Sequence, residues 1–482
     1  MRPTCRLHAL PYRPDPTGYF ERLLSAPGAV LLDSGRPSAQ RGRYDIMSAW
    51  PVKTIRPETE ESGPSFFQRA RRCLGELGDA GFPDGTELPF AGGLLGYLAY
   101  DFGRRLDAPL EREPDDIALP DAILGLYDWA LISDHHAKTS QLIFHPRCTS
   151  ETQARVLSIF PEPQSVAGAA GSRPRAGGRH DVLAPAFTLH DTFRPSTKPG
   201  TYRLAIERIL DYIRAGDCYQ VNYTQRFQAP YKGDPWPAYL ALRHACPTPF
   251  AGYLALDENA TDRATRAEAR AAILSLSPER FMRLQERQIE ARPIKGTRPR
   301  GQTEASDRQQ AEALRNSIKD RAENVMIVDL LRNDIGRSSR IGSVHVPELF
   351  SLETYPNVHH LVSCVRAELA EGLDAFDLLA GSFPGGSITG APKIRAMQII
   401  DELEANRRSI YCGSLLYVDV RGEMDSSITI RTLLAKDGRI SCWGGGGIVM
   451  DSNWQDEYQE SLDKVTVLLR TLESRFIQRR PD

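Results

Sequence analysis

The chain has 482 residues, of which 41% are hydrophobic and 25% charged, and its formal net charge is −2. A chain of this size can bury a large core, as two or three domains or one large one. The near-neutral charge gives no electrostatic basis for binding nucleic acid or an anionic membrane. The eight cysteines form no C-x-x-C pair, and neither a secretory signal nor an apolar run of membrane-spanning length is present. We therefore expect a soluble, cytoplasmic protein.

The first part of the chain predicts strands mixed with a helix. Strands are expected over residues 28–32, 43–50, 90–100, 122–132 and 142–145, and a helix over 62–77. Residues 162–200 are rich in Gly, Ala, Pro and Arg without periodicity, which is typical of a flexible crossing. We accordingly divide the chain into an N-terminal region (1–165), a linker (166–196) and a C-terminal region (197–478).

The second part is denser in pattern. Helices are expected over 198–215, 237–245, 306–331, 374–380, 394–405 and 454–476, and strands over 218–227, 272–277, 280–284, 411–420, 426–435 and 440–443. Residues 257–270 alternate in charge and predict a solvated excursion, and Asp437-Gly438 favours a hairpin turn. Because strands and helices do not alternate regularly, we predict an α+β fold with large packed, sandwich-like β-sheets flanked by helices.

Lys295 lies in the basic string RPIKGTRPR, residues 292–300. Pro293 favours an extended chain, and Gly296 permits another group to approach the backbone closely. The neighbouring arginines, together with burial, would lower the pKa of Lys295 and leave its amine able to act as a nucleophile. A basic turn on the surface is the alternative.

Two pairs of acids lie at helical spacing on two different predicted helices. Asp320 and Glu323 are three residues apart on one helix, and Glu457 and Glu460 on the other. Side chains at this spacing share a helix face. Carboxylates on two helices could hold Mg²⁺, which uses few carboxylates and keeps waters or a substrate oxygen in its octahedron. The alternative for each pair is a solvated face.

Other residues carry weaker signals. Glu279 lies on a turn between two apolar strands, where burial would raise its pKa and suit a general acid; a salt bridge to Arg280 or Arg283 is the alternative. His360 is either a residue of a functional site or a core histidine whose ring nitrogens are hydrogen-bonded. The run Gly444–Gly447 indicates either a close approach of chain or ligand, or a β-bulge.

These residues lie in strings that resemble the chorismate-utilising enzymes. The strings include SLSPERF, RPIKGTRPRG, KDRAENVMIVDLLRNDIGR, VHHLVS, FPGGSITGAPKIRAMQIIDELE, YCGSLLYVD, GGGGIV and EYQESLDKV. Together they span residues from about 197 to 470, and LLDS and GRYDI are similar to the amino-terminal region of the same family. The resemblance implies the chorismate-binding enzyme fold.

The resemblance also implies roles for individual residues. Mg²⁺ would be held chiefly by Glu323 and Glu460, with Asp320 and Glu457 behind them, and would bridge to a carboxylate of chorismate. His360 would lie beside the ring, and Glu279 would protonate the departing C4 hydroxyl. The implied substrate contacts are Gly296, Thr297, Thr389, Tyr411, Arg431, Gly445, Gly446 and Gly447.

Within the family, Lys295 distinguishes two activities. Members that form anthranilate resemble this sequence but carry alanine there, whereas members that form 4-amino-4-deoxychorismate, the precursor of 4-aminobenzoate and folate, carry lysine. The resemblance therefore implies a covalent Lys295 intermediate that ammonia resolves. Gln220 stands where water-adding members carry a lysine base, which disfavours those activities. Anthranilate formation and a non-catalytic ligand-binding relative are the alternatives.

The resemblance implies two further binding partners. A glutamine amidotransferase subunit would supply the ammonia, since the chain shows no Gly-x-Cys-x-Gly-type nucleophile motif. A pocket for L-tryptophan would be formed by Ser34, Tyr44, Pro249 and Phe250. The chain departs from the family there: Ala251 ends a Pro-Phe-Ser-like turn, and Arg41-Gly42 replaces a more typical aromatic and serine. Tryptophan binding is therefore left open.

Overall fold

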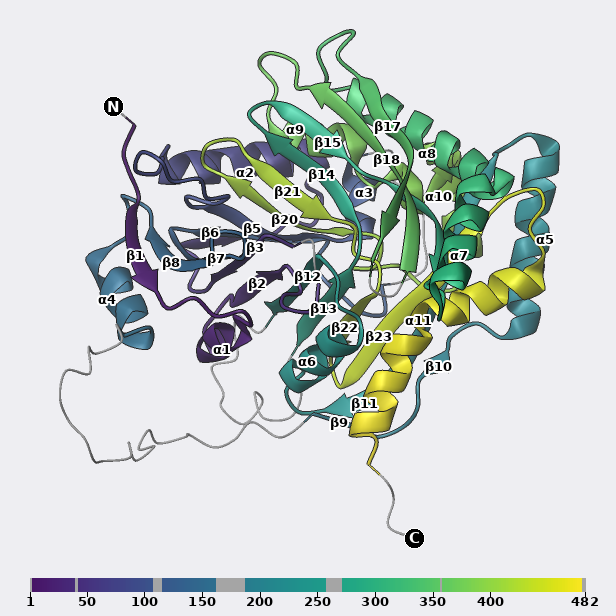
Figure 1. The fold of residues 1–482 in the computed structure, drawn as a ribbon, viewed down its shortest axis with the longest axis horizontal. Coiled ribbons are helices and arrows are strands. Elements are labelled where there is room, and N and C mark those ends of the chain that lie inside the picture. The colour runs from purple at the N-terminus through teal and green to yellow at the C-terminus, as the bar shows by residue number, and fades with distance from the viewer. Residues whose placement is uncertain are drawn as a thin grey trace.

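The computed structural model describes residues 2–39, 42–106, 115–161, 187–256, 271–355 and 358–478. Arg41, residues 166–186 of the expected linker and the expected excursion at 257–270 lie outside the described residues. Within them, two large β-sheets are flanked by helices, as Figure 1 shows. The predicted α+β class is confirmed. Among the described helices, none is long and apolar enough to span a membrane.

The two sheets contain thirteen and ten strands. The first is formed by β1 (Arg6–Leu10), β2 (Val30–Asp33), β3 (Tyr44–Ser48), β7 (Trp129–Asp134), β8 (Thr139–Phe144), β9 (Thr188–Leu189), β10 (Arg194–Pro195), β11 (Gln220–Lys232), β12 (Phe250–Ala255), β13 (Ala272–Ser277), β19 (Gly390–Ala391), β22 (Thr432–Lys436) and β23 (Arg439–Ile448). The second is formed by β4 (Lys53–Ile55), β5 (Gly93–Leu98), β6 (Ala122–Tyr127), β14 (Arg280–Gln285), β15 (Gln288–Ala291), β16 (Ile294–Pro299), β17 (His345–Thr354), β18 (Val358–Glu368), β20 (Ser414–Asp419) and β21 (Met424–Ser427).

Both sheets contain strands from the N-terminal and the C-terminal regions. In the first sheet β2 pairs with β12, with Leu32 opposite Gly252. In the second sheet β5 pairs with β20, with Leu98 opposite Ser414. One large core contains buried side chains from both sheets. The boundary drawn between regions 1–165 and 197–478 therefore does not separate one sheet from the other.

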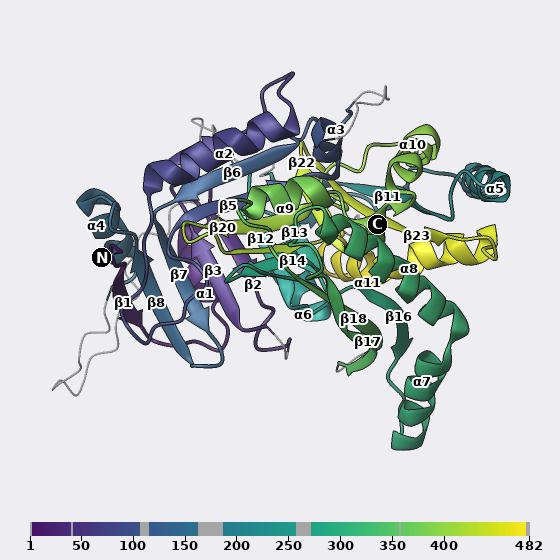
Figure 2. The ribbon, with the colours of Figure 1, turned by 90° about the horizontal axis from the view of Figure 1, so that it is seen from above.

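Helices cover both sheets. They are α1 (Thr17–Phe20), α2 (Gly63–Leu77), α3 (Gly103–Leu106), α4 (Ser150–Ile159), α5 (Pro199–Ala215), α6 (Trp236–Ala245), α7 (Glu304–Asn316), α8 (Ile318–Gly336), α9 (Ala375–Ser382), α10 (Lys393–Leu403) and α11 (Trp454–Phe476). In Figure 2, α2 lies over β5 and β6, with which it is in contact. The closing helix α11 packs along β23, and α8 packs against β16 and β18.

Several expected elements form for the expected local reasons. The Ser62 side chain accepts a hydrogen bond at the start of α2, as an N-cap serine does. Gly216 ends α5 with a φ of 82°, the left-handed conformation that glycine adopts at helix ends. Asp437 and Gly438 also have positive φ and join β22 to β23 in the predicted hairpin.

The single helix predicted over 306–331 is wrong, because two helices occupy that stretch. Thr303, not Ser306, is the N-cap of α7. Ser317 ends α7, and its side chain accepts a hydrogen bond from the Asp320 N–H at 3.2 Å, which begins α8. A serine whose side chain caps a new helix in this way interrupts the helix before it.

Two predicted strands are wrong in a different way, because each is divided between the sheets. The expected strand over 122–132 becomes β6 in the second sheet and β7 in the first, on either side of Asp128. The expected strand over 426–435 similarly becomes β21 and β22. Most residues of both segments are buried, and a continuous buried run does not show where the chain crosses between two packed sheets.

Candidate active site

A cavity of about 990 Å³ lies where β16, α8, the end of β23 and α11 meet. Most of the residues predicted from the sequence line it: Glu279, Lys295, Gly296, Thr297, Asp320, Glu323, His360, Tyr411, Arg431, Gly445, Gly447, Glu457 and Glu460. These residues come from eight separate segments of the C-terminal region. The fold thus brings the proposed nucleophile, general acid and acidic residues into one space.

Gly296 allows β16 to lie close to the helices. Its φ is 91°, and a Cβ there would lie 2.8 Å from Leu314 Cδ1 and 3.0 Å from Asp320 Cβ. A side chain at this position would therefore be strained and would push α7 and α8 away from the strand. The expected close approach is confirmed. Lys295, one residue earlier, extends into the cavity and donates a hydrogen bond to the Ser387 carbonyl at 3.4 Å.

The pKa of Lys295 is lowered, as predicted, and of the two predicted causes burial acts while the neighbouring arginines do not. Desolvation is the main cause, and Lys464 adds to it, while Glu279 is the principal group opposing the shift. The cations named in the prediction are instead paired with acids: Arg292 with Glu348 and Glu353, Arg298 with Asp320, and Arg300 with Asp307. A guanidinium neutralised by a carboxylate has little effect on a nearby amine.

Glu279 lies on the turn between β13 and β14 and is only 7% exposed. Burial raises its pKa to about 7, although the charges of Lys295 and Lys464 act in the opposite direction. Arg280 pairs with Asp425 at 2.9 Å, so the expected alternative of a salt bridge to this neighbour is not found. A carboxyl group that keeps its proton near neutral pH is suited to donate it to a leaving group.

His360 is buried and neutral. Its Nδ1 lies 2.8 Å from Thr297 Oγ1, and the two residues face each other across the β16–β18 pair. Burial, together with the charge of Arg431, lowers the pKa of His360 to about 4. The ring is therefore uncharged at neutral pH and able to lie against a ligand without a competing positive charge.

One wall of the cavity combines stacked rings with a cation. The rings of Tyr411 and Trp443 are 6.0 Å apart and nearly parallel. The indole N–H of Trp443 has no hydrogen-bond partner among the described residues. Arg431 contacts Cys246 Sγ at 3.6 Å and pairs with no carboxylate in the described part of the chain. Its guanidinium is thus available to a carboxylate of a ligand.

The four acids predicted to hold a metal differ in their surroundings. Asp320 is paired with Arg298 at 2.8 Å. Burial raises the pKa of Glu323 and of Glu457. Desolvation acts to raise the pKa of Glu460 as well, but neighbouring lysines outweigh it and leave that pKa below its usual value. Asp320 is therefore the acid least free to bind a cation.

The carboxylates of Glu457 and Glu460 are of the ligand type that a divalent cation prefers. Ser452 donates to one oxygen of Glu457 at 2.6 Å, while the other is buried without a partner among the described residues. That oxygen and Oε1 of Glu460 would lie 3.0 and 3.1 Å from a Cβ on Gly446. The described residues contain no preassembled cluster of three metal ligands. Two converging carboxylates nevertheless suit Mg²⁺, which keeps several waters.

The glycine run in β23 serves close approach rather than a bulge. Its pairing with β11 continues in register through all four glycines. A Cβ on Gly444 would collide with the Ser461 carbonyl of α11, and one on Gly447 would collide with the side chain of Gln220. Of the two readings left open, the structure supports the first, since side chains here would displace α11 and β11.

Two predicted substrate contacts do not line the cavity. Thr389 is fully buried, and its Oγ1 donates to the Gly385 carbonyl at 3.0 Å, so it holds the turn that presents Ser387. Gly446 faces Glu457 and Glu460 rather than open space. Successive residues along a strand point to opposite faces. Gly446 therefore does not share the face of β23 on which Gly445 and Gly447 line the cavity.

Several lining residues were not predicted as site residues. They are Asn222, Thr224, Lys319, Ser387, Cys412, Trp443, Asp463 and Lys464. Alternation along β23 would have indicated Trp443, which lies two residues before Gly445. Lys464 lies one helical turn after Glu460, so its proximity to that acid was also readable from the spacing. The others come from segments whose placement depends on the fold.

A second, smaller cavity of about 190 Å³ lies beside β2, β3 and β12. Ser34, Tyr44, Pro249 and Phe250, the four residues predicted for a tryptophan pocket, all line it. Its remaining lining includes Asp33, Arg280, Asp425, Ser426 and Ser427. The sequence therefore predicted the position of this cavity correctly.

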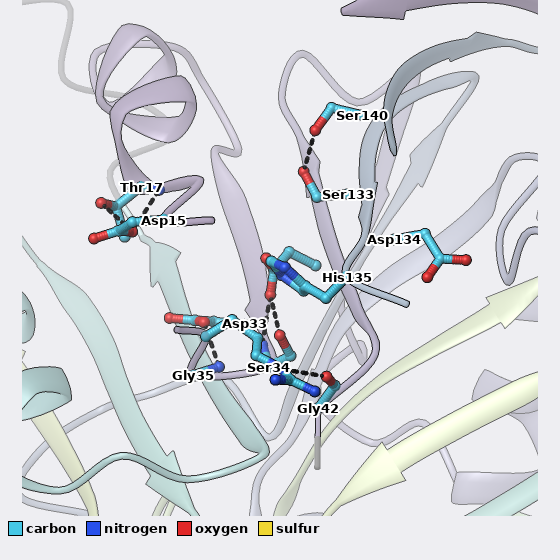
Figure 3. Close-up of polar contacts among 12 residues, drawn as sticks. Asp15, Thr17, Asp33, Ser34, Gly35, Gly42, Ser133, Asp134, His135 and Ser140 are labelled. Carbon is cyan, nitrogen blue, oxygen red and sulfur yellow. Dashed lines mark hydrogen bonds and ion pairs between the residues drawn. The ribbon is translucent and has the colours of Figure 1, made fainter. Parts of the chain in front are cut away.

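Ser34 is held by buried charged groups. Its backbone N–H and its Oγ both donate to Asp45 Oδ1 at 2.7 Å, and Asp45 Oδ2 lies 2.6 Å from His135 Nε2. Figure 3 shows the side chains of Ser34 and His135 converging. Asp33 accepts hydrogen bonds from Arg243 and from Tyr239. This side of the second cavity is therefore rigid and polar.

Comparison with known proteins identifies the family. A model described as chorismate binding enzyme matches residues 29–470. The chain belongs to the chorismate-binding enzyme family. The matched range includes every residue of the large cavity named above and every strand of the two sheets except β1. The resemblance noted in the sequence is thereby confirmed.

Relatives within this family carry two different names. The chain is 44% identical over 477 residues to aminodeoxychorismate synthase component 1 of Salmonella typhimurium, covering 96% of this chain and 98% of that protein. It is 36% identical to anthranilate synthase component 1 of Thermus thermophilus, covering 95% of each chain. Among solved structures, anthranilate synthase component I from Streptococcus pneumoniae matches with a TM-score of 0.71 and 28% identity, covering 90% of this chain and 93% of that one.

Proposed function

We propose that this protein is the component 1 subunit of an aminodeoxychorismate synthase, which converts chorismate and ammonia to 4-amino-4-deoxychorismate for 4-aminobenzoate and folate synthesis. The observation that carries this proposal is Lys295, whose amine has a lowered pKa and extends into the cavity that Glu279 lines. Anthranilate-forming members of the family resemble this chain but lack a lysine there. The higher identity to the Salmonella typhimurium protein also supports this activity over the anthranilate alternative.

The chemistry follows from the two groups together. The neutral amine of Lys295 forms a bond to C2 of chorismate, the two ring double bonds shift, and the C4–O bond breaks. Glu279 gives its proton to the departing C4 oxygen, which leaves as water. Ammonia then bonds to C4 as an ammonium group, the double bonds shift back, and Lys295 leaves C2 as a neutral amine. The new C4 ammonium returns one proton to the Glu279 carboxylate. The net change is the exchange of hydroxyl for amine at C4, with one water released.

The substrate would be held by residues that line the large cavity. Arg431 would bind one carboxylate of chorismate through its guanidinium, next to the N–H groups near Gly445 and Gly447. The stacked pair Tyr411 and Trp443 would cover an apolar face. His360, neutral and buried, would lie beside the ring.

We also propose Mg²⁺ as the cofactor. Glu457 and Glu460 of α11 would hold it, with Glu323 of α8 lining the same cavity, whereas Asp320 is held by Arg298. Bound there, the cation would neutralise a carboxylate of chorismate. The converging oxygens beside Gly446 support this assignment.

A product assay tests the activity. With chorismate, Mg²⁺ and ammonium, the purified protein should form 4-amino-4-deoxychorismate, detected as 4-aminobenzoate after a lyase is added. The glutaminase partner implied by the family resemblance predicts that glutamine replaces ammonium only when that second protein is present. Fluorescent anthranilate as the main product would instead establish the anthranilate alternative. No consumption of chorismate would support the non-catalytic alternative, and efficient use of glutamine by this protein alone would exclude the need for the partner.

We propose that the second cavity binds a free amino acid, L-tryptophan or one of similar structure. Ser427 lines it with a hydroxyl that has no hydrogen-bond partner among the described residues. At 100 times its Kd, a ligand specific for the folded state stabilises a protein by about 2.7 kcal/mol, so L-tryptophan should raise the melting temperature. Ser427→Leu, which fills the cavity without removing a contact, should abolish the rise. An equal rise in both proteins, or in neither, would contradict this assignment.

A further inference from the structure

Lys464 makes two contacts inside the large cavity that the proposed reaction does not use. Its Nζ lies 2.6 Å from Glu460 Oε1 and donates a hydrogen bond to the Gly445 carbonyl at 2.8 Å. Glu460 and Lys464 each keep nearly half of their side-chain surface accessible, 49% and 46%. The ammonium is therefore fixed in position but open to the solvent of the cavity.

The same place has the features of a cation site. Glu457, which is 5% exposed, has a carboxylate oxygen that is buried without a partner among the described residues. That oxygen and the Glu460 oxygen held by Lys464 both lie next to Gly446, which has no side chain to fill the space. The one positive charge of Lys464 thus contacts Glu460 and leaves an oxygen of the neighbouring Glu457 carboxylate without a partner among the described residues.

We propose that Lys464 occupies the cation site of the ligand-free protein and must release Glu460 before a divalent metal ion binds. This inference rests on the metal site of the proposed function and assigns to Lys464 a positioning role towards it. Releasing Glu460 has a small energetic cost, because an accessible ion pair at i,i+4 spacing contributes little to stability. The hydrogen bond to Gly445 leaves the freed ammonium a place within the cavity.

Lys319 provides a matched comparison in the same cavity. It lines the same space and acts on the same acids through its charge. It makes no hydrogen bond or ion pair within the described residues. Removal of Lys319 takes away one repelling charge, whereas removal of Lys464 takes away a repelling charge and also a competing contact.

The experiment measures Mn²⁺ binding by electron paramagnetic resonance in the absence of chorismate, with Mg²⁺ as competitor. Lys464→Met should bind Mn²⁺ about three- to tenfold more tightly than the wild type. Lys319→Met should also change the Mn²⁺ affinity. On a logarithmic scale, this change should be less than half of the change caused by Lys464→Met. Lys464→Arg, which keeps a cation on the same stem, should stay near the wild-type affinity. Thermal unfolding of each variant verifies that it is folded.

The outcomes separate this inference from the metal site itself. Equal affinities of the wild type and Lys464→Met, weaker binding by Lys464→Met, or equal gains in the two methionine variants would overturn the role of Lys464 and leave the metal site standing. Absence of Mn²⁺ binding in every protein, with and without chorismate, would remove the metal site and this inference with it. If the wild type binds Mn²⁺ as expected but forms no 4-amino-4-deoxychorismate, the proposed reaction would be wrong, while the metal site and the role of Lys464 would stand.

Discussion

Lys295→Ala is expected to lower the rate of 4-amino-4-deoxychorismate formation by about 10³-fold or more, because removing a covalent nucleophile is among the most damaging changes to an enzyme. Desolvation lowers the pKa of this amine and so favours its neutral form, and alanine supplies no atom to bond to C2. With the lysine gone, ammonia can reach C2 directly. A small yield of anthranilate is therefore expected in place of the original product, measured by fluorescence beside the coupled 4-aminobenzoate assay.

Lys295→Arg is the matched control for this prediction. Arginine keeps a positive charge in the cavity but is protonated at all accessible pH values and is no nucleophile. If Lys295 acted only by its charge, this variant would keep most of the activity; the covalent mechanism predicts that it loses activity as alanine does. Wild-type protein quenched with chorismate should carry the adduct on the peptide that contains Lys295. Absence of the adduct, with full activity in both variants, would make the covalent mechanism wrong.

Glu279→Gln is expected to lower the rate by about 10²- to 10⁴-fold, the usual contribution of a general acid. Glutamine has nearly the same shape and fills the same turn, so folding should be retained and the loss should fall on kcat. Glu279→Asp, which keeps an acid on a shorter side chain, should retain more activity than Glu279→Gln. A glutamine variant as active as the wild type would show that another group protonates the leaving oxygen.

The pH profile of kcat/KM provides a second measurement on Glu279. Its raised pKa of about 7 means that the carboxyl group carries its proton below that pH and loses it above. The wild-type rate should therefore fall on the alkaline side as Glu279 ionises, and on the acid side as Lys295 is protonated. Because the two groups interact, the measured values belong to the pair. In Glu279→Gln the alkaline fall should disappear, and its persistence would assign that fall to a different group.

The local sequence pattern was sufficient to predict structure where a side chain, or its absence, affects only the residues next to it. The helices predicted over 62–77 and 198–215 form as α2 and α5, and Ser62 and Gly216 cap them, because capping depends on a few neighbouring residues. The approach of a helix to Gly296 was expected from the absence of a side chain. Pattern was insufficient at Ser317 and Asp128, where a cap or a crossing between sheets divides a continuous run.

The chemistry-bearing residues show the same limit. The sequence indicated an amine of lowered pKa at Lys295 and named burial correctly as a cause. It also credited the nearby arginines, which are instead paired with acids from other segments of the chain. It likewise grouped Asp320 with the metal ligands, although Arg298 holds that carboxylate. Ion pairs form between side chains that folding brings within a few ångströms, and sequence spacing does not record such distances outside a single helix.

By itself, the sequence determined the fold class, the family, the set of residue types in the large cavity and the four residues that mark the second cavity. The fold class depends on periodicity and the acid pairs on helical spacing. The family, the substrate contacts and the four residues of the second cavity were implied by the resemblance that the matching strings carry. Only the tertiary structure decided which acids are free, which cation lies on Glu460, that Thr389 supports a turn, and that Trp443 lines the cavity. These outcomes depend on burial and on partners from other strands and helices, and both arise only when the two sheets and their helices pack together.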